Sequence, residues 1–129
     1  MIMKEGKVLL GRRKSSHGTG EYAFPSAAVS NLESFEDCAR RSAKKESALE
    51  IDNVQFQFLA NITHFAPVHY IFVGMIADWK AGELQTLPES TCVEWAWYGL
   101  DEIPRLRFKN VDLAIEAHTK GTSYFGVVE

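Results

Sequence analysis

Three side chains that could act together are Ser42, Lys45 and Glu46, which lie three and four residues apart in one segment. In a helix, this spacing places them on one face, about one turn apart. Three carboxylates in that arrangement would form an oxygen site for Mg²⁺, and one of them could orient an attacking water. Here one hydroxyl, one ammonium and one carboxylate give a formal charge of zero. We therefore expect this face to repel a dication rather than collect one.

The segment that carries these residues, 34–49, is the clearest predicted helix. Ser34 suits the N-cap, and acidic residues follow in the first turn while lysines come late, as the helix dipole favours. One apolar stripe is available for burial, made of Phe35, Cys38, Ala39, Ala43 and Leu49. Glu50 comes four residues after Glu46, so we expect it to be able to add a carboxylate to the same face.

The rest of the chain predicts a mixed sheet around this helix. Glu5-Gly6 separates two apolar runs, which is typical of a hairpin turn. The nearly continuous apolar run at 69–78 indicates a central strand buried on both faces. Further strands are predicted at 53–61 and 93–98, and a second helix at 110–118, closed by Gly121. This order favours one α+β domain over residues 1–129, a mixed sheet with helices on its faces.

Basic and aromatic residues near the first hairpin are candidates for ligand binding. Arg12 and Arg13 follow an apolar strand, and their guanidinium groups match the geometry of phosphate oxygens. The alternative is that they belong to a solvated turn. Phe24, just before a proline, and Trp95 are candidates for a wall against which a base stacks; the alternative is that both belong to the core.

The spacing of residues 27–49 resembles the Nudix box, G-x5-E-x7-R-E-U-x-E-E-x-G-U, in which U is a bulky aliphatic residue. Glu33 stands at the first glutamate, Arg41 at the arginine, and Glu46 at the last glutamate. The flanking segments are also similar to those of the family. The resemblance covers roughly residues 7 to 108 and is closest to MutT-like nucleoside triphosphate hydrolases.

This resemblance implies an α/β/α sandwich and Mg²⁺-dependent hydrolysis of a nucleoside diphosphate linked to another group. It also implies that Glu33 and Arg41 form an ion pair that supports the box. The sequence departs from the family at Ser42 and Lys45, where the family has metal-binding glutamates. Glycines of the family pattern are replaced as well, at Ala27, Leu32 and Ala48.

Three functions are open on these residues. The first is a Nudix domain with weak or no hydrolase activity that binds a nucleotide-like small molecule. The second is a genuine Mg²⁺-dependent hydrolase in which Glu46 serves as residual metal ligand and catalytic group. Substitute carboxylates such as Glu50, Glu89 or Glu94 would then assist it. The third is a non-catalytic structural or dimerisation domain, because members of the family often form homodimers.

Composition limits the partners further. The formal net charge is −3, so no strong basic field is available for binding nucleic acid. The two cysteines, Cys38 and Cys92, are too few for a disulfide framework and indicate reduced thiols. No segment approaches the roughly 20 apolar residues of a membrane span. We expect a cytoplasmic protein that binds neither nucleic acid nor membrane.

Overall fold

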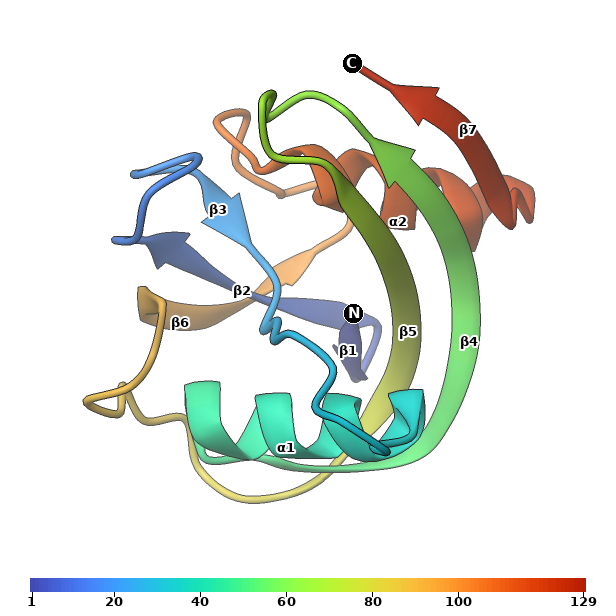
Figure 1. The fold of residues 1–129 in the computed structure, drawn as a ribbon. Coiled ribbons are helices and arrows are strands. Elements are labelled where there is room, and N and C mark those ends of the chain that lie inside the picture. Colours follow the sequence, from blue (N-terminus) through green and yellow to red (C-terminus); the bar gives the residue numbers. More distant parts are fainter.

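A strongly curved mixed sheet forms the centre of the computed structural model, which describes all 129 residues (Figure 1). The strands lie in the order β3-β2-β1-β5-β4-β7, and β6 pairs with β2. Two helices, α1 (Phe35–Ser47) and α2 (Lys109–Lys120), complete an α/β/α sandwich. The strands are β1 (Ile2–Lys4), β2 (Lys7–Arg13), β3 (Tyr22–Ala23), β4 (Glu50–Ile62), β5 (Tyr70–Ala81), β6 (Cys92–Gly99) and β7 (Tyr124–Val128).

The predicted first hairpin is confirmed and connects the two halves of the sheet. Its turn residues, Glu5 and Gly6, both have positive φ, as the tight turn between β1 and β2 requires. On its other side, β1 runs parallel to β5, with Ile2 opposite Ala77. This short strand therefore joins the β2–β6 half of the sheet to the long β5–β4 ladder.

The predicted helix around the box is also confirmed. The Ser34 hydroxyl caps α1 by accepting a hydrogen bond from the Asp37 N–H at 3.0 Å. At the other end, Ala48 has a left-handed conformation with φ 65°, and the chain leaves the helix there. Glu50 is consequently the first residue of β4. The expectation that it shares a helix face with Glu46 is wrong, because the helix has already ended at Ser47.

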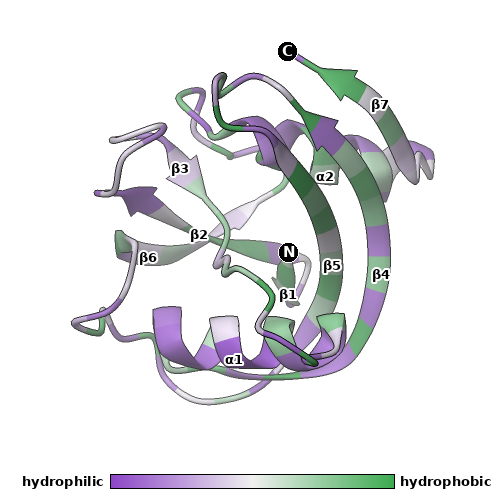
Figure 2. Ribbon diagram, viewed as in Figure 1, coloured by the Kyte–Doolittle hydropathy of each residue, from purple (hydrophilic) through white to green (hydrophobic).

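The prediction that residues 69–78 are buried on both faces is wrong. β5 is hydrophobic along most of its length (Figure 2), but Ile71 is 64% exposed, and only Gly74 and Ala77 are fully buried. No helix covers the outer side of this part of the sheet (Figure 1). The last residues form β7, which pairs parallel to β4, with Leu59 opposite Tyr124.

Two further features bear on the expectations from composition. Both cysteines, Cys38 and Cys92, are free and buried. Neither helix is long and apolar enough to cross a lipid bilayer.

Candidate functional site

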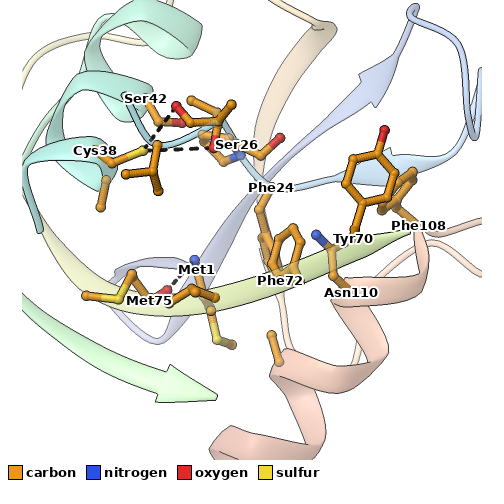
Figure 3. A pocket seen from close by; sticks show the side chains of 18 of the residues that line it. Met1, Phe24, Ser26, Cys38, Ser42, Tyr70, Phe72, Met75, Phe108 and Asn110 are labelled. Carbon is orange, nitrogen blue, oxygen red and sulfur yellow. Dashed lines mark hydrogen bonds between the residues drawn. The ribbon is translucent and has the colours of Figure 1, made fainter. Parts of the chain in front are cut away.

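A cavity of about 670 Å³ opens between the inner side of β4 and β5, the helices α1 and α2, and the loop that follows β3 (Figure 3). This volume lies in the range of small-molecule sites. Of its 32 lining residues, 21 are hydrophobic, so the cavity suits a ligand with a large apolar or aromatic part. No aspartate or glutamate lines it.

The end of the cavity near α2 is aromatic. Phe24, Phe72, Tyr70 and Phe108 line it, together with Asn110 of α2 (Figure 3). Asn110 is 3% exposed, and its Oδ1 has no hydrogen-bond partner among the protein groups. Aromatic walls with a few convergent polar groups are typical of sites for planar heterocycles. Phe24 therefore lies where the stacking hypothesis requires it, whereas Trp95 packs against Gly11 and does not line the cavity.

The end of the cavity near α1 is lined by small side chains. Ser42 is 5% exposed, and its hydroxyl has no protein partner. Cys38 lies close by, with Sγ 3.9 Å from the carbonyl oxygen of Ala27 and 3.8 Å from that of Ala28 (Figure 3). Burial raises the pKa of the Cys38 thiol, so it is a neutral group in this wall.

Glu46 is not among the residues that line the cavity, but its carboxylate is held by Thr91, the residue just before β6, which does line it. Oε2 accepts a hydrogen bond from the Thr91 N–H at 2.8 Å, and Oε1 accepts one from the Thr91 hydroxyl at 3.1 Å. The Ser90 hydroxyl also donates to the Glu46 carbonyl oxygen at 2.5 Å. Burial raises the pKa of Glu46, and the two Thr91 hydrogen bonds oppose that rise.

The residues around Ser42 therefore do not fit Mg²⁺. Ser42 lines the cavity, Glu46 is bonded to Thr91, and Lys45 is exposed, so this helix face offers only one carboxylate. The positive charges of Lys45 and Arg13 both act on the single carboxylate. No group of three histidine, cysteine, aspartate or glutamate side chains is arranged to hold a metal ion. A hard dication needs several oxygen ligands, and this set offers one engaged carboxylate.

The Glu33–Arg41 ion pair implied by the resemblance is present. Arg41 donates to both carboxylate oxygens of Glu33 at 2.8 Å, and also to the Ala28 carbonyl at 2.8 Å. The Ser30 N–H donates to the same carboxylate at 3.0 Å. The hydrogen bonds from Arg41, and then that from Ser30, lower the pKa of Glu33 to about 2. This network fixes the loop whose residues 26–29 line the cavity.

The two arginines predicted to bind substrate lie in different places. Arg12 does not line the cavity but forms a two-point ion pair with Glu94, at 2.8 and 3.1 Å. Glu94 was expected to assist Glu46 as a substitute carboxylate in metal binding, and here it is paired with Arg12 instead. Arg13 does line the cavity, with its guanidinium carbon 4.2 Å from the centre of the Phe108 ring and its Nε donating to the His17 carbonyl.

The remaining candidate carboxylates lie away from the cavity. Glu89 is exposed in the connection before β6. Glu50 lines a separate shallow groove, together with Arg40, Lys44 and Lys80. Neither side chain is placed to complete a metal site with Glu46.

Comparison with known proteins decides the family. A family model described as the NUDIX domain matches residues 1–117. The chain belongs to the Nudix family. An oxidized purine nucleoside triphosphate hydrolase of Danio rerio is 33% identical over 110 residues, which cover 81% of this chain and 65% of that protein. A Nudix relative from Pseudomonas putida, the NAD-capped RNA hydrolase NudC, is 26% identical over 107 residues, or 82% of this chain and 37% of that protein.

Solved structures show the same Nudix fold. The MutT NUDIX hydrolase of Burkholderia pseudomallei superposes with a TM-score of 0.84 at 22% identity, covering 92% of each chain. The NUDIX domain of Shewanella oneidensis NrtR, complexed with ADP ribose, has a TM-score of 0.73 at 20% identity, covering 90% of this chain and 78% of that one. The chain spans less than two thirds of the length of the two curated relatives, 65% and 37%.

Two of the substituted glycine positions of the Nudix pattern keep a backbone that suits glycine. Leu32 and Ala48 both have φ 65°, whereas Ala27 does not have positive φ. Of the three substituted positions, residue 27 has an ordinary backbone conformation, and the loop residue Leu32 and the C-cap residue Ala48 are left-handed. Each left-handed residue with a side chain is strained relative to glycine.

Sequence reasoning missed several cavity residues. The sequence places Asn110 only at the start of the predicted helix 110–118, and Gln57 only within the predicted strand 53–61. A polar residue on the otherwise apolar face of an amphipathic helix was the available signal for Asn110. The missed lining side chains that carry polar or aromatic groups include Gln57, Phe65, Tyr70, Thr91, Phe108 and Asn110.

Proposed function

We propose that this Nudix domain binds a nucleotide-like ligand without requiring a divalent metal, and hydrolyses it weakly or not at all. The observation that carries the proposal is the engagement of Glu46. It is the last acidic residue of the Nudix box, and Thr91 occupies both of its oxygens. These bonds take about two of the roughly four lone-pair sites of the carboxylate. It is the only carboxylate left of the three in the box, so this face lacks the several oxygen ligands that a hard dication needs.

The shape and lining of the cavity support a ligand that combines an aromatic ring with an anionic group. The aromatic end suits a base, and Arg13 places one permanent positive charge in the lining. Its Nε and Nη2 donate to the 15–17 loop, so Nη1 is the end left to pair with phosphate oxygens. The relatives handle compounds of this class: a purine nucleoside triphosphate, NAD-capped RNA and ADP ribose appear in their names. For this chain we propose a ligand of the same chemical class, a nucleotide-like compound.

No hydrolytic step is assigned to this cavity. In the family a metal ion supplies charge neutralisation and an activated water. Here no carboxylate lines the cavity, and the residues around Ser42 do not fit a dication. What remains is binding: the aromatic wall holds a ring, Arg13 neutralises part of an anionic group, and the Glu33–Arg41 pair keeps the loop in place.

Calorimetric titration of a panel of nucleoside triphosphates, with Mg²⁺ and then with EDTA, tests the proposal. We expect the same Kd under both conditions, and chromatography should show no turnover near the ordinary enzyme range of about 1 s⁻¹ and above. Binding that needs Mg²⁺, together with turnover, would support the genuine hydrolase instead. If no nucleoside triphosphate binds, the remaining function is the non-catalytic structural or dimerisation domain.

One observation favours a second candidate function, a domain that forms homodimers. The outer face of the β5–β4–β7 ladder carries exposed apolar side chains, including Ile71, Tyr124 and Val127, at 64%, 65% and 65% exposure. Apolar surface of this kind often marks a protein interface. Sedimentation velocity over a range of concentrations tests this candidate. Concentration-dependent dimers that are lost in Ile71→Glu would support it, and a monomer at all concentrations would exclude it.

A further inference from the structure

Gln57 occupies an irregular position in β4 that turns its side chain toward the cavity. The β4–β5 register passes from Phe56 opposite Met75 to Phe58 opposite Gly74, which leaves Gln57 without a partner on β5. In a regular strand, Gln57 and Phe58 would point to opposite faces, yet both line the cavity. A β-bulge has this effect, and bulges are often found beside functional sites, where they re-aim a side chain.

The orientation of the Gln57 amide is determined by its neighbour on α2. Its Nε2 donates to the Ala114 carbonyl oxygen at 3.3 Å. Turning the amide around would place Oε1 against that carbonyl, and two acceptors cannot bond to each other. Oε1 is therefore the free end, and it has no hydrogen-bond partner among the protein groups.

A second amide without a hydrogen-bond partner lies on the same part of α2. Asn110 precedes Ala114 by four residues, so the two share one helix face and are separated by about 6 Å along the axis. The Oδ1 of Asn110 also lacks a protein partner. The unpaired Gln57 acceptor lies in a largely apolar wall and favours a ligand that presents an N–H group, because a buried acceptor without a partner is costly. No hydrogen bond fixes the orientation of the Asn110 amide, so it can serve the same ligand as donor or acceptor.

We infer that Gln57 is a specificity-determining residue that accepts a hydrogen bond from an N–H group of the bound heterocycle. The site then prefers a base that carries an amino group over the same base without it. This inference rests on the proposed nucleotide-like ligand and adds the chemistry by which that ligand is selected. Gln57 is assigned no part in bond breaking.

Pairs of triphosphates that differ by one amino group provide the test. Guanosine and inosine triphosphates differ at the 2-amino group, and adenosine and purine riboside triphosphates at the 6-amino group. In the wild-type protein we expect the amino form of at least one pair to bind about five- to tenfold more tightly, the usual effect of one hydrogen bond. In Gln57→Leu, both members of that pair should bind equally.

Gln55→Leu is the matched control, since Gln55 lies on the same strand but is exposed and bonded to Asn53. This variant should keep the wild-type preference. Equal binding of both members of each pair by the wild-type protein would overturn the inference, as would an undiminished preference in Gln57→Leu. If Gln57→Leu is unfolded, Gln57→Met serves in its place. If no triphosphate binds the wild-type protein, the proposed function fails, and the inference fails with it.

Discussion

Both carboxylate oxygens of Glu46 accept hydrogen bonds from one residue, Thr91, which lies 45 positions further along the chain. The Thr91 backbone N–H donates to one oxygen at 2.8 Å, and the Thr91 hydroxyl donates to the other at 3.1 Å. The last acidic group of the Nudix box thus anchors the start of β6 to α1. In this chain, Glu46 has the contacts of a structural residue.

Removing this anchor should cost stability. In Glu46→Ala, the Thr91 N–H loses its partner in a poorly solvated place, so we expect the free energy of unfolding to fall by about 2 kcal/mol. Urea denaturation followed by tryptophan fluorescence measures the change. Glu36→Ala removes an exposed carboxylate from the same helix and should change stability by less than about 0.5 kcal/mol. Equal midpoints for the wild type and Glu46→Ala would contradict the anchoring role.

The Glu33–Arg41 pair predicts how stability changes in acid. The pKa of Glu33 is lowered from 4.5 to about 2, so the folded state favours the ionised form. Its contribution is complete above pH 4.5 and is lost as the pH falls toward 2. Denaturation midpoints measured across this window should decline less steeply in Glu33→Gln than in the wild type. Parallel curves for the two proteins would show that the ion pair does not contribute.

The left-handed residue at the end of α1 predicts a stabilising substitution. Ala48 has φ 65°, a conformation that glycine adopts without strain. Ala48→Gly should therefore raise the free energy of unfolding by roughly 1 kcal/mol. The control, Ala39→Gly, lies inside the helix and should lower it by about 0.5–1 kcal/mol. Destabilisation by both glycines would mean that the strain at residue 48 is absent.

Much of the fold followed from local patterns. Ser34 with its acidic first turn predicted α1, and Glu5-Gly6 predicted the first hairpin, because capping and tight turns depend on a few adjacent residues. Burial of β5 could not be obtained in this way, since it depends on which faces of the sheet other elements cover. The outer side of that strand has no cover, and Ile71 is exposed there.

The sequence predicted the helix α1 but not which side chains form the site. Spacing placed Ser42, Lys45 and Glu46 on one helix, but the direction of the Glu46 side chain depends on Thr91, a distant residue. The inward turn of Gln57 depends on a bulge that alternation does not reveal. Contacts between distant segments decided which side chains reach the cavity.

Restoring the missing carboxylates should restore metal affinity. Ser42→Glu combined with Lys45→Glu returns three acidic residues to the box, and the cavity beside Ser42 leaves room for a longer side chain. We expect at least about tenfold tighter Mg²⁺ binding by calorimetry, because an ammonium is replaced by attractive charges. Ser42→Glu with Lys44→Glu makes the same change in net charge, but residue 44 does not face residue 42. An equal gain in this control would attribute the effect to net charge alone.

The most direct test of the disabled metal site is titration of the wild-type protein with Mn²⁺, followed by the paramagnetic signal of the free ion. The neutral set of Ser42, Lys45 and Glu46, with Glu46 bound to Thr91, predicts that the signal rises as it does in buffer, with no ion bound at millimolar concentrations. One Mn²⁺ bound per chain below about 1 mM, and lost in Glu46→Gln, would contradict the account.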